Sequence, residues 1–297
     1  MFDRVIKHEL GYYEVKEKPT VKELNEYYSK KYYQDSKGAY QQEYSNEETL
    51  FFRNKLEQKY NIILSELNNS NHKLQNLSLL DVGCGEGWAL DFFKNKNWNV
   101  VGLDYSSFGC SKFNPDCVEN LIVGDIYENL NNLKKESQKF DVIFLMNVLE
   151  HVLNPIELLN DFKNIIAENG ILLIEVPNDF SNLQLHLLNN GMIDKPFWIA
   201  IPDHISYFTK DSLSNLGDFC GWKLNKLTTG YPIDLNLFNE NTNYIMDRTK
   251  GKSVHKARVK IENFLHEQSP DKTNLIFEAM ANVGIGRNII AFMTIKK

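Results

Sequence analysis

The stretch LLDVGCGEG, residues 79–87, leads from an apolar run into three glycines at alternate positions. The apolar residues predict a buried strand, and the segment GWALDFFKNK predicts a helix that opens at Gly87. Glycines leave room for a ligand to reach the backbone, and the first N–H groups of a helix attract polar or anionic groups. The stretch therefore predicts a strand, a ligand-binding turn and a helix in succession.

Short apolar runs alternate with helical patterns through the middle of the chain, which is typical of a parallel sheet covered by helices. A helix is expected over NPIELLNDFKNIIAENG, because Asn154 fits the N-cap, Pro155 the first helical position and Gly170 the residue past the end. Another is expected over TKDSLSNLGDFCGW, ending near Gly221. The expected strands are SLLDVGC, NVVGLD, NLIVGD, FDVIFLMN, GILLIEVPN, KLNKLTTG and NIIAFMTIKK.

Two parts of the chain depart from this alternation. Residues 1–75 are rich in tyrosine and are predicted to form a mainly helical N-terminal cap, which leaves residues 76–297 as the ligand-binding domain. Residues 179–208 and 231–285 are predicted to be insertions around the last strands. Because ligands of open α/β sheets bind beyond the carboxyl ends of the strands, we expect these additions to cover the site.

Composition limits the partners and the compartment. A formal net charge of -6 gives no general attraction to phosphate backbones, so no nucleic-acid partner is expected. No run approaches the roughly 18 apolar residues of a membrane span, and the charged, aromatic N-terminus does not resemble a signal peptide, so a cytoplasmic location is predicted. The four cysteines form no CxxC pair and have no histidines at zinc spacing, which predicts reduced thiols and no metal ligands.

Acidic residues stand at the ends of three predicted strands. Asp81 precedes Gly83 by two residues, Asp104 ends the second strand and Asp125 follows the third. A carboxylate at Asp104 can accept hydrogen bonds from both ribose hydroxyls, and Asp125 can accept one from an adenine amino group. Asp81 can accept from an ammonium group, which NAD lacks, and the turn reads GxGxG where the dinucleotide fingerprint is GxGxxG. These features disfavour NAD as the ligand.

The segments LLDVGCGEGWALDFFKNKNWNVVGLDYS and FDVIFLMNVLEHVLNPIELLNDFKNIIAENGILLIEVPN resemble class I S-adenosylmethionine-dependent methyltransferases, in particular their ubiquinone-type branch, over residues 77–178. The resemblance implies an α/β fold with a Rossmann-like, seven-stranded sheet, mostly parallel with an antiparallel last strand. It also implies S-adenosylmethionine as the cofactor and S-adenosylhomocysteine as the product. The implied cofactor contacts are Asp81, Gly83, Cys84, Gly85, Gly87, Asp104, Tyr105, Asp125, Ile126, Met146 and Asn147.

Two histidines are candidate catalytic residues. The segment WIAIPDHISYFTKDSL resembles the region after strand five in methyltransferases of polysaccharide and deoxysugar pathways, where a histidine faces the transferred methyl group. That histidine is His204 in this sequence, beside Asp203, with Trp198 and Tyr207 as candidate acceptor contacts. A sugar hydroxyl becomes a good nucleophile when a base takes its proton, which suits a histidine. His151, in the LEHV turn, is either a second candidate base or an orienting residue.

The N-terminal segment resembles the helical cap of such enzymes. Arg53 could meet the methionine carboxylate, and Tyr44 or Tyr40 could close over the sulfonium, because aromatic faces attract its positive charge. A basic run, RTKGKSVHKARVKIENF from residue 248, could meet the phosphates of a nucleotide-linked or phosphorylated acceptor. A solvated helix face explains that run equally well.

The predicted function is O-methylation of a sugar, surface-polysaccharide or nucleotide-sugar acceptor by direct in-line transfer. A quinone-like small-molecule O-methyltransferase stays open because that branch shares the LEHV turn, and so does N- or C-methylation of a sugar. The alternatives from other classes are an NAD-dependent oxidoreductase and a non-catalytic S-adenosylmethionine-binding protein. The residues do not specify the acceptor, the dependence on metal or the oligomeric state.

Overall fold

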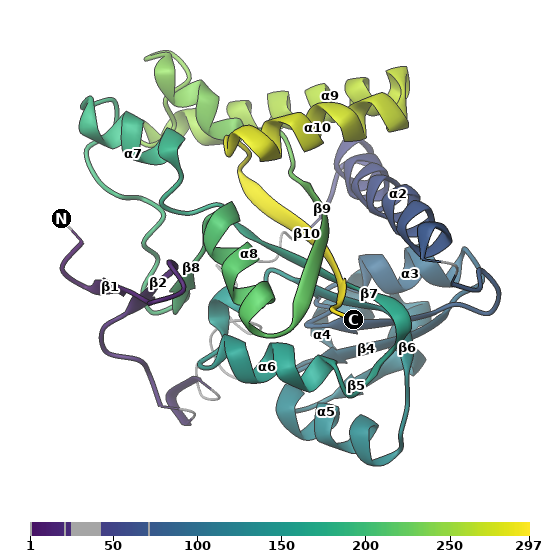
Figure 1. Cartoon of the computed structure of the whole chain (residues 1–297). Helices are drawn as coiled ribbons and strands as arrows, with labels where there is room; N and C mark the ends of the chain where they lie inside the picture. Colours follow the sequence, from purple (N-terminus) through teal and green to yellow (C-terminus); the bar gives the residue numbers. More distant parts are fainter. Residues whose placement is uncertain (1, 21, 25–42, 71) are drawn as a thin grey trace.

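A seven-stranded sheet with helices on both faces forms the centre of the computed structural model, which describes residues 2–20, 22–24, 43–70 and 72–297 (Figure 1). The strand order is β5-β4-β3-β6-β7-β10-β9. β10 runs against both of its neighbours, β7 and β9, whereas the remaining pairs are parallel. This arrangement confirms the predicted sheet and its antiparallel last strand. The strand bounds are β3 (Ser78–Val82), β4 (Asn99–Asp104), β5 (Leu121–Val123), β6 (Phe140–Met146), β7 (Ile166–Pro177), β9 (Trp222–Thr228) and β10 (Asn288–Ile295).

Each face of the sheet has its own apolar core, because neighbouring residues of a strand point to opposite sides. In β6, Ile143 and Leu145 face α5, α6 and α8, whereas Val142 and Phe144 face α2 and α3. The helix bounds are α2 (Asn46–Asn69), α3 (Trp88–Lys94), α4 (Phe108–Phe113), α5 (Ile126–Lys135), α6 (Pro155–Phe162), α7 (Asn182–Asn189), α8 (Lys210–Phe219), α9 (Gly251–Gln268) and α10 (Pro270–Val283). Four 3-10 segments of the described residues lie between these helices and strands: η2 (Pro115–Asn120), η3 (Leu149–His151), η4 (Ile233–Phe238) and η5 (Arg248–Lys250).

The helix predicted to run from Pro155 towards Gly170 is shorter than expected. Its start is as predicted, because the Asn154 side chain accepts a hydrogen bond from the backbone of Glu157. The predicted end is wrong, because α6 stops at Phe162 and β7 begins four residues later. The apolar run continues into a buried strand that pairs with β6, and a short apolar run does not by itself distinguish a helix from a strand.

The expectation that residues 1–75 are mainly helical is wrong for their first part. Two short strands there, β1 (Val5–Lys7) and β2 (Tyr13–Val15), form a small sheet with β8 (Ser206–Tyr207), while α2 supplies the predicted helix. In this sheet Tyr13 lies opposite Tyr207. The pairing joins segments far apart in the sequence, so the local pattern around Tyr13 does not reveal it.

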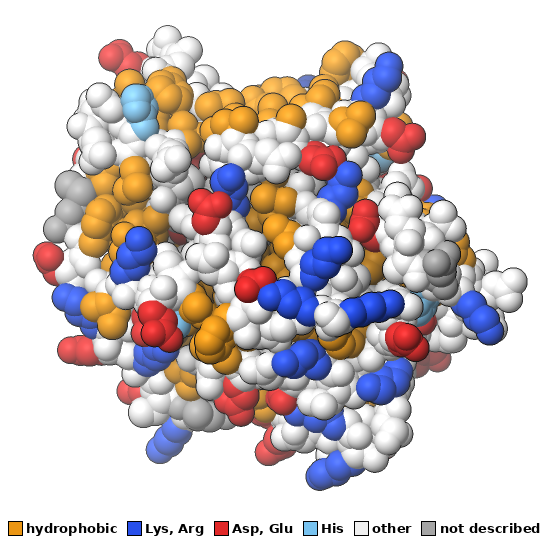
Figure 2. Space-filling view, viewed as in Figure 1, with side chains coloured by type: hydrophobic (Ala, Val, Ile, Leu, Met, Phe, Trp, Pro, Cys, Tyr) orange, Lys and Arg blue, Asp and Glu red, His pale blue; other side chains and the backbone are white. Residues whose placement is uncertain are grey.

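The two predicted insertions carry their own elements. Residues 179–208 include α7 and β8, and residues 231–285 include η4, η5, α9 and α10. α9 lies along α2, where the Asn54 side chain donates to that of Asn263 over 3.0 Å. Figure 2 shows hydrophobic side chains along the rim formed by α9 and α10. Exposed apolar residues of these helices are Ile261, Phe264, Leu275, Ile276 and Val283.

No helix within the described ranges combines the length and apolar character needed to cross a bilayer. The cysteines have the predicted free thiols: all four are buried and unpaired, at positions Cys84, Cys110, Cys117 and Cys220.

A buried ion pair ties α2 to the central sheet. The Lys59 ammonium lies 3.0 Å from the carboxylate of Glu175 in β7, Lys55 lies 3.8 Å from it, and the Asn288 side chain donates to it. Although burial opposes ionisation, the two lysines lower the pKa of Glu175 to about 2. The carboxylate is therefore charged in the folded protein down to strongly acidic pH.

We predict that Glu175→Gln lowers the free energy of unfolding at pH 7 by about 3 kcal/mol, because Lys59 would keep a buried charge without its carboxylate. The pKa of an unfolded glutamate is about 4.3. The contribution of Glu175 is thus fully present above that value and is lost as the pH falls towards 2. Urea unfolding at pH 7 and at pH 3 measures both effects, with the exposed Glu267→Gln as the control. Equal stability of the two variants at pH 7 would contradict the prediction.

Candidate active site at the carboxyl edge of the sheet

The glycine turn after β3 has a backbone that only glycine adopts easily. Gly83, Gly85 and Gly87 have φ values of 74°, 54° and 78°, and Gly87 is the N-cap of α3. A Cβ atom on Gly83 would also collide with Cγ2 of Val148, in the loop after β6. The turn is therefore fixed in shape and in direct contact with that loop.

The predicted acidic residues gather beneath and beside this turn. The Asp104 carboxylate accepts hydrogen bonds from the Gly85 N–H over 2.8 Å and from the Ser106 N–H over 3.1 Å. Asp81 is buried nearby, and burial together with the charge of Asp104 raises the pKa of Asp81 to about 7. Asp125 caps α5 and accepts from the Tyr105 hydroxyl over 3.1 Å. The structure thus brings Asp81, Asp104, Tyr105 and Asp125 to one edge of the sheet.

The other predicted cofactor residues are divided between the turn and the core. The side chain of Cys84 is buried against Gly102 of β4, and burial raises the pKa of its thiol. Ile126 is buried at the start of α5, and Met146 is half-buried at the end of β6. Asn147 has a φ of 55° and donates its N–H to the Glu175 carbonyl over 2.7 Å, which turns the chain towards η3.

Tyr44 lies against the glycine turn. Its hydroxyl donates to Glu86 over 2.9 Å, and the indole N–H of Trp88 donates to the other oxygen of that carboxylate over 2.7 Å. The ring of Tyr44 contacts the rings of Phe52 and Trp88. The sequence prediction missed Glu86, although an acidic residue between two glycines of the motif was a visible signal.

Arg53 points away from this group. Phe52 faces Trp88, and the next residue of a helix is rotated by about 100°. Arg53 is accordingly exposed and lines a groove of about 570 Å³ with Asp91 and Asn95. The structure therefore does not bring Arg53 to the glycine turn, and Tyr40 lies outside the described residues.

His151 and His204 meet edge to face, with ring centroids 4.9 Å apart. The Nδ1 of His151 lies 2.7 Å from the backbone carbonyl of Asp203, and the N–H of Ile205 donates to the carbonyl of Glu150 over 2.8 Å. These contacts hold η3 against the first insertion. Burial lowers the pKa of His204 to about 3, with contributions from His151 and Arg287, and burial also lowers the pKa of His151 against the effect of Asp203.

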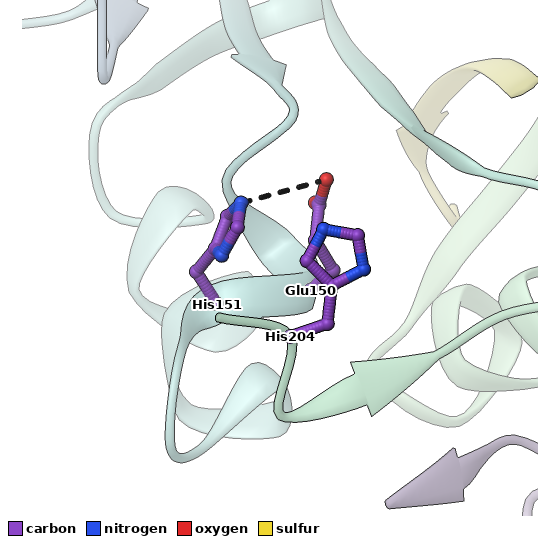
Figure 3. A group of neighbouring side chains, drawn as sticks. All are labelled: Glu150, His151 and His204. Carbon is purple, nitrogen blue, oxygen red and sulfur yellow. Dashed lines mark ion pairs between the residues drawn. The ribbon is translucent and has the colours of Figure 1, made fainter. Parts of the chain in front are cut away.

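Glu150 is a third member of this group that the sequence prediction missed. Figure 3 shows its carboxylate close to both imidazoles, and its Oε1 lies 3.8 Å from Nε2 of His151. Burial raises its pKa well above the ordinary value. Neighbouring side chains usually diverge, so the letters of LEHV alone do not reveal that both point into one cluster.

A cavity of about 390 Å³ lies beside His204. One wall comes from the first insertion and the other from the N-terminal segment, and the lining residues are Val15, Glu17, Lys18, Pro19, Glu23, Leu24, Ile201, Pro202, His204 and Ile205. Trp198 and Tyr207, predicted as acceptor contacts, are not on this wall. They are 2% and 1% exposed and pack in an apolar cluster, because Tyr207 lies in the small sheet and Trp198 lies against Phe180.

The basic run lies on α9 and the turn before it. Lys252, Lys256 and Lys260 are exposed, while Arg258 pairs with Glu262 over 2.7 Å. This placement agrees with a solvated helix face.

A family model described as a methyltransferase domain matches residues 42–227 of the chain. The chain belongs to the class I S-adenosylmethionine-dependent methyltransferase family. Among the solved structures, the plantazolicin methyltransferase BamL, in complex with a triazolic desmethylPZN analog and SAH, has 15% sequence identity and a TM-score of 0.50. That match covers 84% of this chain and 86% of BamL, and it shows a shared fold.

Curated relatives match a shorter region. The ubiquinone biosynthesis O-methyltransferase of Glaesserella parasuis serovar 5 is 28% identical over 123 residues, which is 39% of this chain and 51% of that protein. The tRNA U34 carboxymethyltransferase of Histophilus somni is 34% identical over 107 residues, which is 34% of this chain and 33% of that protein. The chain thus spans about half the length, or less, of these relatives.

We predict that Gly83→Ala weakens S-adenosylhomocysteine binding at least tenfold, because the new methyl group would displace Val148 and strain the turn. Gly191→Ala is the matched control: its φ is also positive, at 67°, and a Cβ there meets nothing within 4 Å. Calorimetric titration of both variants measures the dissociation constants. Wild-type affinity in Gly83→Ala would show that the turn does not shape the cofactor site.

Proposed function

We propose that the protein transfers the methyl group of S-adenosylmethionine to a hydroxyl oxygen of an acceptor bound in the cavity beside His204. The observation that carries this proposal is a continuous set of contacts from the glycine turn to that cavity. Gly83 touches Val148, three residues before His151, whose ring touches His204 on the cavity wall. A cofactor at the turn and an acceptor in the cavity would thus meet at the two histidines.

The positions of the strand-edge carboxylates support the assignment of the cofactor contacts. Asp104 would accept from the ribose hydroxyls and Asp125 from the adenine amino group, on either side of Tyr105. An ammonium group near the buried Asp81 would favour the ionised carboxylate. Tyr44, held on Glu86, would close the opposite side of the cofactor.

The reaction is a direct displacement. The acceptor oxygen attacks the methyl carbon as the carbon–sulfur bond breaks, and the electron pair of that bond stays on sulfur to give the thioether S-adenosylhomocysteine. The hydroxyl proton passes to the imidazole of His204, with His151 as the second candidate. Alignment and exclusion of water supply most of the rate, because the cofactor already carries an activated group.

A sugar is the acceptor class that we propose first. Glu17, Lys18 and Glu23 give the cavity polar groups that can hydrogen-bond to sugar hydroxyls, and Lys18 could also meet a phosphate of a nucleotide-linked sugar. A second candidate is a quinone-like phenol. The apolar wall formed by Leu24, Ile201 and Ile205 favours this candidate, as does the resemblance to the ubiquinone biosynthesis O-methyltransferases.

Two variants separate transfer from cofactor binding. His204→Ala is expected to lower kcat/KM for methyl transfer at least 100-fold, because positioned acid–base groups contribute about 10²–10⁴-fold. It should change the dissociation constant of S-adenosylhomocysteine less than twofold. Asp104→Asn should weaken that binding at least tenfold, since an amide cannot accept as a carboxylate does. Full turnover in His204→Ala would remove His204 from the mechanism.

A panel of acceptors tests the class of substrate. We expect release of S-adenosylhomocysteine with nucleotide sugars or phosphorylated sugars, and weaker release with catechols. The reverse order of kcat/KM would favour the quinone-like candidate. Absence of turnover with every acceptor, despite tight cofactor binding, would favour a non-catalytic S-adenosylmethionine-binding protein.

A further inference from the structure

We propose that Glu150, His151 and His204 form a binding site for a divalent transition-metal cation. One ligand atom from each of the three residues can be chosen so that all lie within 4.8 Å of one another. Two ligands of one zinc-like ion lie no more than about 4.4 Å apart, given bonds of about 2.0–2.2 Å. Small side-chain rotations would therefore bring the three donors into one coordination sphere, and Figure 3 shows all three pointing toward the same space.

The strongest observation is an unpartnered carboxylate. Glu150 is 2% exposed, and within the described residues its Oε2 is buried without a hydrogen-bond partner. A buried carboxylate without partners is costly, and a cation is one of the few groups that remove this cost. The cluster thus offers a cation a carboxylate oxygen that no described protein group binds.

The two histidines are already arranged as ligands. The Nδ1 of His151 lies 2.7 Å from the Asp203 carbonyl, to which it donates, and its Nε2 lies 3.8 Å from Oε1 of Glu150. A histidine that ligates a metal usually donates its other N–H in this way, which fixes its tautomer. The Nδ1 of His204 is buried 3.9 Å from the carboxylate of Asp179, a position from which Asp179 could serve as the outer partner.

The donor set indicates the class of cation. Two imidazole nitrogens and one carboxylate oxygen suit zinc, manganese, iron, cobalt or nickel, whereas magnesium prefers oxygen ligands and water. Three protein ligands leave further coordination positions open, as in catalytic metal sites. Because His204 also lines the cavity of about 390 Å³, an acceptor hydroxyl there could take an open position.

This inference rests on the proposed function in one respect, namely the role of the cation. A hydroxyl bound to a divalent cation loses its proton more easily. The proton would be released to water, and the oxygen would then attack the methyl carbon as the carbon–sulfur electron pair returns to sulfur. With the cation bound, His204 holds the metal and no longer takes the proton.

Metal binding can be measured without any acceptor. Tag-free protein is treated with a chelator, dialysed and titrated with Co²⁺, whose visible absorption reports its ligands, and with Zn²⁺ and Mn²⁺ by calorimetry. We expect one equivalent of cation per chain, with affinity at least 100-fold lower in Glu150→Gln and in His204→Asn. His186→Asn is the matched control, because His186 is exposed on α7 and outside the cluster. Thermal unfolding of each metal-free variant verifies that it is folded.

The outcomes distinguish this proposal from the proposed function. Absence of stoichiometric binding, or equal affinity in the wild type, Glu150→Gln and His204→Asn, would overturn the metal site. Such a result would leave cofactor binding and transfer untouched, since S-adenosylhomocysteine titration and methyl transfer are measured separately. A loss of transfer after chelation that Mn²⁺ or Zn²⁺ restores supports the catalytic role. Equal transfer with and without cation would overturn that role.

Discussion

The hydrogen bonds of the Asp104 carboxylate to the turn after β3 are the interaction on which the site depends. Gly85 and Ser106 both donate backbone N–H groups to this buried side chain, which joins the ends of two neighbouring strands. With the turn fixed, α3 begins at Gly87 and Val148 can lie directly on Gly83. The loop after β6 therefore takes its position from the glycine turn, and η3, which carries Glu150 and His151, follows that loop.

Two buried glutamates show how differently the fold treats a charge. Glu175 has ammonium groups and an amide around it, so its carboxylate binds α2 to the sheet. Glu150 is as deeply buried and has two imidazoles as neighbours, and its Oε2 has no partner in the described ranges. Removing one partner from a satisfied pair of the first kind would leave an uncompensated buried charge and lower stability. A buried carboxyl group of the second kind reduces stability unless something binds there, and such costs are typical of functional sites.

The sequence allowed prediction of what depends on neighbours in the chain. The strand Ser78–Val82, the glycine turn and the helix start at Asn154 and Pro155 follow from local patterns, whereas the antiparallel last strand was implied by the family resemblance. Prediction failed where distant segments decide the outcome. β2, which contains Tyr13, pairs with the distant β8 as well as with β1, and Trp198 is core because the first insertion packs against itself and against the N-terminal segment. The direction of Arg53 depends on which face of α2 meets α3, a tertiary contact that helical periodicity does not determine.

The proposed cofactor site and the proposed acceptor site differ in the same way: the first depends on local patterns and the second on contacts between distant segments. The proposed cofactor contacts come mainly from the parallel sheet and its first turns, whose geometry is determined by regular strand pairing. The cavity comes from the N-terminal segment and the first insertion, which the small β1-β2-β8 sheet holds together. His204 lies two residues before β8, so its place beside His151 depends on the pairing of β8 with β2. The acceptor site is therefore built by additions to the sheet, and changes in these additions can alter acceptor choice while the glycine turn stays the same.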